Sequence, residues 1–167
     1  MTKVAFIGLG TMGRPMAERL RGAGFDVVGM DVDAGMRAAF DGAIAPAAAP
    51  LAEADVILTM LPEGRHVSEV YAEAILPGAS AGTLLIDCST IDVETTRTLA
   101  AQARAAGLAM LDAPVSGGPA GAESGGLSFM VGGGQAAFER AQPMFAAMGA
   151  KITHFGASGS GQAAKAC

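Results

Sequence analysis

Three glycines near the N-terminus have the spacing that lets a polypeptide backbone come close to a phosphate group. Gly8, Gly10 and Gly13 form a GxGxxG motif that follows an apolar run and precedes a helical pattern. In such a motif the first glycine permits a tight turn, the second lets backbone approach a pyrophosphate, and the third allows close helix packing. The helix N-terminus adds N–H donors and partial positive charge. The motif therefore predicts a dinucleotide site, with Thr11 and Met12 in its loop.

A carboxylate at the expected distance supports that prediction and favours NAD over NADP. Asp31 ends the next apolar run, 18 residues after Gly13, close to the ~20 residues expected for the group that binds the adenosine ribose. Its charge would repel a 2′-phosphate, and neither Val32 nor Asp33 offers a positive charge to receive one. The alternative interpretation is a glycine-rich turn beside a solvated aspartate.

Further candidate cofactor residues follow apolar runs typical of strands in the same sheet. Ligands of open α/β sheets bind at the carboxyl ends of the strands. The residues that we expect to face the cofactor there are Leu61, Pro62, His66 and Thr90. For His66, which lies in the first turn of a predicted helix, the alternative is a surface histidine without a role.

A second group of residues has the chemistry to bind a small acid and move a proton. Successive backbone N–H groups in the turn of Ser116, Gly117 and Gly118 can bind a carboxylate, although an ordinary glycine loop remains an alternative. Lys165 follows a glycine-rich stretch, on a helix expected to begin near Ser160. Positive potential at a helix start favours neutral lysine, the form that accepts a proton in general acid/base catalysis. The alternative is a solvated lysine.

The elements that must position these residues alternate between strand and helix. Apolar runs predict strands at 3–8, 26–31, 55–61, 83–88, 108–113, 127–132 and 151–155, with a weaker pattern at 43–45. Helical patterns fall between them, at 12–23, 34–41, 47–54, 65–75, 93–106 and 136–148. The alternation predicts an α/β fold with a doubly wound, mostly parallel Rossmann-type sheet. Asp92 is a predicted N-cap, and Gly24 and Gly107 are predicted C-cap glycines.

Composition limits the function classes. The chain has 167 residues, enough for one domain with a full core, and a net charge of −5 without a lysine or arginine cluster, which argues against nucleic acid binding. No apolar run reaches the ~18 residues of a membrane span. Cys88 and Cys167 suit neither a disulfide scaffold nor a metal site, and the N-terminus lacks the regions of a signal peptide. We therefore expect no metal, no membrane partner and a cytoplasmic location.

Five of these stretches together resemble the β-hydroxyacid dehydrogenase family. They are residues 8–13, 59–62, 86–90, 112–118 and 159–165, and they follow the family order over the whole chain. The resemblance implies that NAD is the cofactor and that a small hydroxyacid is oxidised to a semialdehyde. It further implies that Ser116, Gly117 and Gly118 hold the substrate carboxylate, and that Lys165 is the proton-transfer residue at the reacting hydroxyl.

The resemblance also predicts a domain organisation. We expect residues 1–158 to form the NAD-binding domain and residues 159–167 to begin an interdomain helix that is truncated here. Family members continue with an Asn four residues beyond the lysine and an all-helical C-terminal domain that usually forms a homodimer. Two alternatives stay open: a reductase of tartronate, succinic or glyoxylic semialdehyde, and a noncatalytic dinucleotide-binding scaffold.

Overall fold

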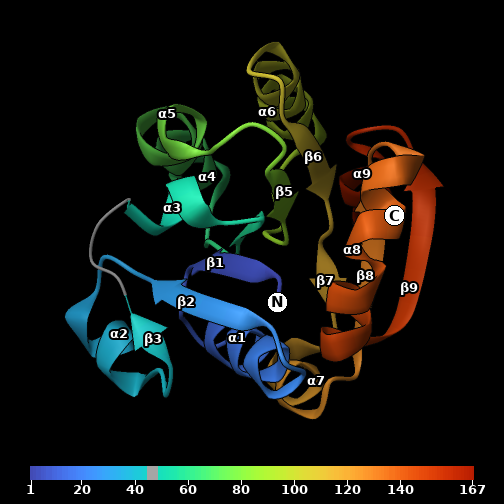
Figure 1. Ribbon diagram of the computed structural model, residues 1–167. Helices are drawn as coiled ribbons and strands as arrows, with labels where there is room; N and C mark the ends of the chain where they lie inside the picture. Colours follow the sequence, from blue (N-terminus) through green and yellow to red (C-terminus); the bar gives the residue numbers. More distant parts are fainter. Residues whose placement is uncertain (45–48) are drawn as a thin grey trace.

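The alternating sequence pattern folds into consecutive β-α-β units around one twisted sheet (Figure 1). The structure is a computed structural model that describes residues 1–44 and 49–167. Its elements in chain order are β1 (Lys3–Ile7), α1 (Gly13–Gly22), β2 (Asp26–Met30), α2 (Ala34–Ala39), β3 (Ala43–Ile44), α3 (Ala49–Glu53), β4 (Val56–Thr59), α4 (Gly64–Val70), the π-helical turn η1 (Tyr71–Ile75), α5 (Leu76–Gly78), β5 (Leu84–Asp87), α6 (Val93–Ala105), β6 (Ala109–Asp112), β7 (Val115–Ser116), α7 (Gly118–Ser124), β8 (Leu127–Gly132), α8 (Gln135–Met148), β9 (Gly149–Gly156) and α9 (Ser160–Ala166). The start of the predicted helix 47–54 lies outside the described residues.

The strand order confirms the predicted fold class. Six parallel strands lie in the order β3-β2-β1-β4-β5-β6, which is the doubly wound order of dinucleotide-binding folds. Beyond β6 the sheet becomes mixed, because β8 runs antiparallel to both β6 and β7, while β9 pairs in parallel with β8. The chain order reverses between β1 and β4, so a crevice is expected at their carboxyl ends.

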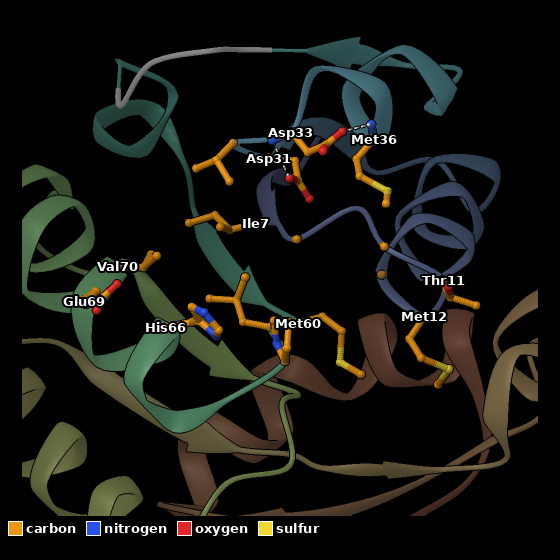
Figure 2. Close-up of a pocket in the computed structure, with 16 residues that line it drawn as sticks. Ile7, Thr11, Met12, Asp31, Asp33, Met36, Met60, His66, Glu69 and Val70 are labelled. Atoms are coloured by element: carbon orange, nitrogen blue, oxygen red, sulfur yellow. Dashed lines mark hydrogen bonds between the residues drawn. The ribbon is translucent and has the colours of Figure 1, made fainter.

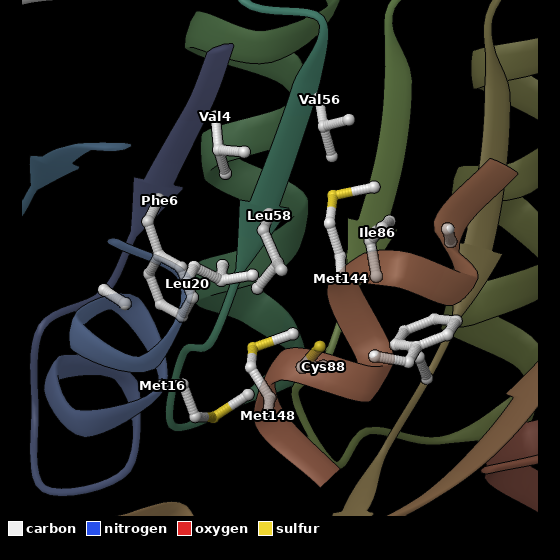
Figure 3. Packing of buried hydrophobic residues seen from close by; sticks show 14 of the residues in the cluster. Val4, Phe6, Met16, Leu20, Val56, Leu58, Ile86, Cys88, Met144 and Met148 are labelled. Atoms are coloured by element: carbon white, nitrogen blue, oxygen red, sulfur yellow. The ribbon is translucent and has the colours of Figure 1, made fainter. Parts of the chain in front are cut away.

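Both faces of the sheet are buried, which explains the long apolar runs. Val4 and Phe6 of β1 pack in one core cluster, and the alternate residues Ala5 and Ile7 pack in the other. Figure 3 shows the first cluster, in which α1 and α8 place methionine and leucine side chains over β1, β4 and β5. The helical segments α3 to α6 supply the second cluster on the opposite face. Parallel strands covered on both sides read as continuous hydrophobic runs.

Local signals set several element ends as predicted. The Asp92 carboxylate accepts a hydrogen bond from the Thr95 N–H at 2.8 Å and caps α6. The hydrogen bond to Thr95 lowers the pKa of Asp92. Gly24 and Gly107 follow α1 and α6 with φ of +98° and +75°, the conformation that favours glycine after a helix.

Two segments differ from the sequence-based expectation. The predicted helix 65–75 is interrupted, because η1 gives its second half a π-helical turn that buries Tyr71. The stretch after Asp112, expected as a glycine loop, contains the short strand β7 and the helix α7. Neither element is long enough to produce a readable hydrophobic period.

The described residues also bear on the predicted absences. None of their helices combines the length and apolarity that a bilayer crossing needs. Within the same residues, no three or more His, Cys, Asp or Glu side chains gather in a group able to hold a metal ion.

Candidate active site

Strand register brings the ends of three separate chain segments together at one edge of the sheet. Ile7, the last residue of β1, pairs with Met30 of β2 and with Thr59 of β4. The Gly8 N–H then donates to the Met30 carbonyl at 2.8 Å, and the Met60 N–H donates to the Ile7 carbonyl at 2.9 Å. The glycine motif, Asp31 and the Met60 turn therefore meet at the point where the strand order reverses, which is the expected ligand position.

The three motif glycines have three different surroundings. Gly8 has φ of +104°, and a Cβ there would collide with the Met60 carbonyl oxygen. A Cβ on Gly13 would collide with the Gly8 carbonyl oxygen. Beside Gly10, by contrast, no described atom lies within 4 Å of the place a Cβ would take. The first and third glycines thus serve packing, and the second leaves space open for a close approach by a ligand.

Asp31 is fixed by backbone donors on either side of it. Its Oδ2 accepts a hydrogen bond from the Leu9 N–H at 2.8 Å, and its Oδ1 accepts one from the Asp33 N–H at 2.9 Å. The carboxylate thereby ties the glycine loop to the turn after β2. It stands where the ribose-binding acid of a dinucleotide site belongs.

Arg37 is a cation at this place that the sequence analysis did not single out. Its Nη1 donates to the backbone carbonyl of Asp31 at 2.7 Å and to that of Val32 at 3.1 Å. Arg37 lies on α2, six residues after Asp31. A positive charge was sought only at the two residues that directly follow Asp31, and Arg37 was therefore missed. The guanidinium holds the turn that carries Asp31, and it places a positive charge beside that turn.

The three strand ends enclose a cleft of about 600 Å³, shown in Figure 2. It is lined by Ile7, Gly8, Gly10, Thr11, Met12, Gly13, Asp31, Val32, Asp33, Met36, Met60, Leu61, Pro62, His66, Glu69 and Val70. Every predicted cofactor residue except Thr90 is in this set, and Thr90 is an exposed residue beyond β5. The cleft volume, the open side of Gly10 and the position of Asp31 fit a dinucleotide.

His66 lies in the wall of the cleft, on α4. Its ring is half-buried, and among the described residues its Nδ1 has no hydrogen-bond partner. The adjacent wall contains Leu61, whose N–H donates to the Ser89 hydroxyl at 2.8 Å. Ser89 therefore fixes the turn after β4 from the neighbouring strand.

The predicted substrate turn and the predicted proton-transfer lysine lie together. The Lys165 Nζ donates a hydrogen bond to the Ser116 Oγ at 3.1 Å. Gly117 and Gly118 follow with φ of +133° and +61° and are exposed at the start of α7. Lys165 is the sixth of the seven residues of α9. The helix-start potential falls off within one turn, so Ser116, rather than the start of α9, is the group that orients the amine.

Gln162 connects α9 with the wall of the cleft. Its Nε2 donates to the Ser89 carbonyl at 2.7 Å, and its Oε1 accepts from the Ile91 N–H at 3.3 Å. The side chain is buried. Because Ser89 also holds Leu61, one chain of hydrogen bonds joins the lysine helix to the cofactor side.

Asp87 is a buried acid beneath this network. Its Oδ1 accepts hydrogen bonds from the Thr59 hydroxyl at 2.8 Å and from the Ser89 N–H at 3.1 Å. Burial, with a smaller contribution from the nearby Asp112, raises the pKa of Asp87 to about 6 in spite of the lowering effect of these hydrogen bonds. Burial and the Asp87 charge likewise raise the pKa of the Tyr71 hydroxyl. The Asp87 carboxyl is therefore protonated over more of the acidic pH range than an ordinary aspartate.

Comparison with known proteins assigns the fold and the cleft to a family. The family model described as the NAD binding domain of 6-phosphogluconate dehydrogenase matches residues 3–156. The chain belongs to this family. The resemblance inferred from the five motifs is confirmed at this level, and so is NAD as the cofactor of the domain.

Relatives of this NAD-binding domain include dehydrogenases of small hydroxyacids. The NAD-dependent L-serine dehydrogenase of Pseudomonas aeruginosa is 49% identical over 174 residues, and the 3-hydroxyisobutyrate dehydrogenase of the same organism is 47% identical over 173 residues. Each match covers 100% of this chain and 58% of the relative. The chain therefore spans little more than half the length of these enzymes.

Among solved structures, a 3-hydroxyisobutyrate dehydrogenase from Mycobacterium tuberculosis with L-serine superposes on the domain with a TM-score of 0.96 at 46% identity. The match covers 100% of this chain and 58% of that one. The architecture of the sheet and cleft is thus that of a known dehydrogenase domain.

Proposed function

We propose that the protein containing this domain oxidises the primary hydroxyl of 3-hydroxyisobutyrate to methylmalonate semialdehyde, a step of valine degradation. The hydrogen bond between Lys165 and Ser116 carries the proposal, because it joins a proton acceptor to a carboxylate-binding turn. The relatives named as 3-hydroxyisobutyrate dehydrogenases support the choice of substrate.

The first group of residues would bind the cofactor. Bound in the cleft, NAD supplies a hydride acceptor. Gly10 leaves room for its pyrophosphate, and Asp31 accepts hydrogen bonds from its adenosine ribose. Leu61, Pro62 and His66, which line the cleft, and Thr90 beyond them would face the nicotinamide half.

The substrate side is built from the second group. Backbone N–H groups at Gly117 and Gly118, with the Ser116 hydroxyl, bind the carboxylate. The Lys165 amine then stands at the β-hydroxyl and takes its proton as the carbinol carbon loses hydride. Because the substrate and the Lys165 amine are held in one complex, the proton transfer becomes effectively unimolecular, which lowers its barrier.

L-Serine is a second candidate substrate, favoured by a specific observation. One relative is named an NAD-dependent L-serine dehydrogenase, and one solved relative is described with L-serine. L-Serine and 3-hydroxyisobutyrate share a carboxylate and a primary β-hydroxyl, and differ in an ammonium or a methyl group on the carbon between them. Ser116 and Lys165 would bind the carboxylate and the hydroxyl of either substrate in the same way. The preference therefore depends on whether an apolar residue, which favours the methyl group, or an acidic residue, which favours the ammonium group, lies beside that carbon.

The test is NADH formation by the gene product, read to its stop codon, with 3-hydroxyisobutyrate, L-serine and tartronate as separate substrates. Lys165→Ala should lower kcat by about 10²–10⁴-fold, the usual contribution of a general base. Lys151→Ala, which removes an exposed lysine from β9, is the matched control and should leave kcat unchanged. A parent protein that binds NAD but oxidises no hydroxyacid would instead favour a noncatalytic scaffold.

The domain boundary at residue 158, the cytoplasmic location and a homo-oligomeric state stay predictions. α9 packs against β6, β8, β9 and α6, so the described part of this helix lies on the NAD-binding domain.

A further inference from the structure

A buried carboxylate from the middle of the sheet holds the start of the lysine helix. Asp112, the last residue of β6, is 1% exposed. Its Oδ1 accepts from the Gly159 N–H at 2.9 Å, and its Oδ2 accepts from the Gln162 N–H at 3.1 Å. The first N–H groups of a helix have no partner within the helix. Asp112 supplies both acceptors from a residue 47 to 50 positions earlier.

The backbone of α9 packs closely against β8, with no space for an added side chain at two glycines. A Cβ on Gly132 of β8 would lie 2.7 Å from the Asp112 Oδ1 and 2.8 Å from the Ala157 carbonyl oxygen. A Cβ on Gly161 would collide with the Met130 carbonyl oxygen. Glycine at both places lets α9 lie directly on β8, next to the Asp112 carboxylate. The helix position is therefore set by backbone contact as well as by the two hydrogen bonds.

Asp112 is connected to both members of the lysine and serine pair. Ser116 lies four positions after Asp112 along the chain. The Gln162 N–H, which donates to Asp112, lies three positions before Lys165 on α9. The Asp112 carboxylate is therefore one of the contacts that set the distance between the Lys165 amine and the Ser116 hydroxyl.

We propose that Asp112 is a positioning residue for the proton transfer: its carboxylate holds α9 on the sheet so that Lys165 meets the hydroxyl of a substrate whose carboxylate is bound at Ser116. The proposal rests on the proposed function, since it gives Lys165 the role assigned there. Asp112 itself does not touch substrate, and it acts through the helix.

Asp112→Asn tests the proposal in the full gene product. The amide keeps one oxygen acceptor but turns an NH₂ donor toward one of the two backbone N–H groups, so a buried donor loses its partner. A displacement of about 1 Å at the amine can cost about 10²-fold in rate. We expect kcat to fall by that order, with the KM for NAD unchanged, because the cofactor cleft is built from other strand ends.

Thr83→Val is the matched control. The Thr83 hydroxyl is buried and donates to the Ala54 carbonyl at 3.1 Å, at the start of β5 and far along the strand from the site. The variant loses a buried hydrogen bond without touching α9. It should lower the unfolding midpoint in urea while keeping kcat per folded molecule at the parent value.

Amide hydrogen exchange gives a readout that does not depend on turnover. In Asp112→Asn the amide of Gly159 or of Gln162 that faces the new NH₂ group should exchange faster, because it loses its acceptor, while the amides of β1 should not change. If this variant does not fold, Gly161→Ala displaces α9 from the same carboxylate and should show the same kcat loss.

The outcomes separate the two proposals. An active parent whose Asp112→Asn variant retains its kcat, with or without faster exchange, would overturn the positioning role and leave the proposed function standing. A parent inactive on every hydroxyacid would overturn the proposed function, and the positioning role in that reaction with it.

Discussion

The Lys165 amine donates a hydrogen bond to the Ser116 hydroxyl at 3.1 Å, although 49 residues separate them in sequence. The contact joins α9 to β7. It brings an amine and a hydroxyl next to two exposed glycines, where the proposed function puts substrate binding and proton transfer.

Ser116→Ala should weaken substrate use rather than cofactor binding. The variant removes one hydrogen bond to the substrate carboxylate and the partner that orients Lys165. A hydrogen bond to a charged group is worth about 1.5–3 kcal/mol, so kcat/KM should fall by about 10- to 100-fold. Steady-state NADH formation measures the change. Ser124→Ala, at the exposed end of α7, is the control, and an equal loss there would remove the special role of Ser116.

Asp31→Asn should shift cofactor preference toward NADP. It removes the charge that repels a 2′-phosphate, while Arg37 remains close to the same turn. We expect weaker NAD binding and a ratio of NADP to NAD dissociation constants that falls by at least about tenfold, or about 1.4 kcal/mol. Calorimetric titration with both cofactors gives the ratio. Asp26→Asn, an exposed change at the opposite end of β2, should leave it unchanged.

The glycine motif should separate stability from cofactor binding. Gly8→Ala places a Cβ against the Met60 carbonyl in a strained backbone, and overpacking of this kind costs about 1–3 kcal/mol. Gly10→Ala enters open space, so its free energy of unfolding should match the parent while NAD binding drops. Urea unfolding and NAD titration of both variants provide the comparison. Equal stability losses at the two positions would contradict the packing argument.

Asp87 should make the domain less stable as pH rises from about 4 to 6. Its pKa is raised from 3.8 to about 6 in the fold, mainly by burial. Below pH 4 both states are protonated and its contribution is fully present. As pH rises, the unfolded chain ionises first, so stability falls by about 3 kcal/mol until the native carboxyl ionises near pH 6. Urea unfolding at a series of pH values measures this slope.

Asp87→Asn should remove that part of the pH dependence. The amide keeps the oxygen that accepts from Thr59 and Ser89 but does not titrate. Glu123→Gln, an exposed change on α7, should preserve the slope of the parent. If Asp87→Asn and the parent gave parallel curves between pH 4 and 6, Asp87 would not be the titrating group.

Much of the cofactor cleft could be predicted because its signals are local. The spacing of Gly8, Gly10 and Gly13 reflects a turn, a close approach and a helix contact within six residues. Asp31 was found because one β-α-β unit has a nearly fixed length, so the next strand end falls at a known distance. Because neighbouring strands are parallel, their carboxyl ends lie at the same edge of the sheet, and the fold class alone is enough to predict that these residues lie close together.

The sequence by itself determined the fold class, the approximate positions of most strands and the residue types at the candidate site, because hydrophobic periodicity and glycine spacing are local properties of the chain. Only the tertiary structure decided which of these residues are in contact with one another. The contact of Lys165 with Ser116, the cap that Asp112 places on α9, the link from Gln162 to Ser89 and the reach of Arg37 to the Asp31 turn are side-chain contacts. Most of them span 47 to 73 residues. Such contacts depend on how helices seat on the sheet, and that packing leaves no periodic trace in the sequence.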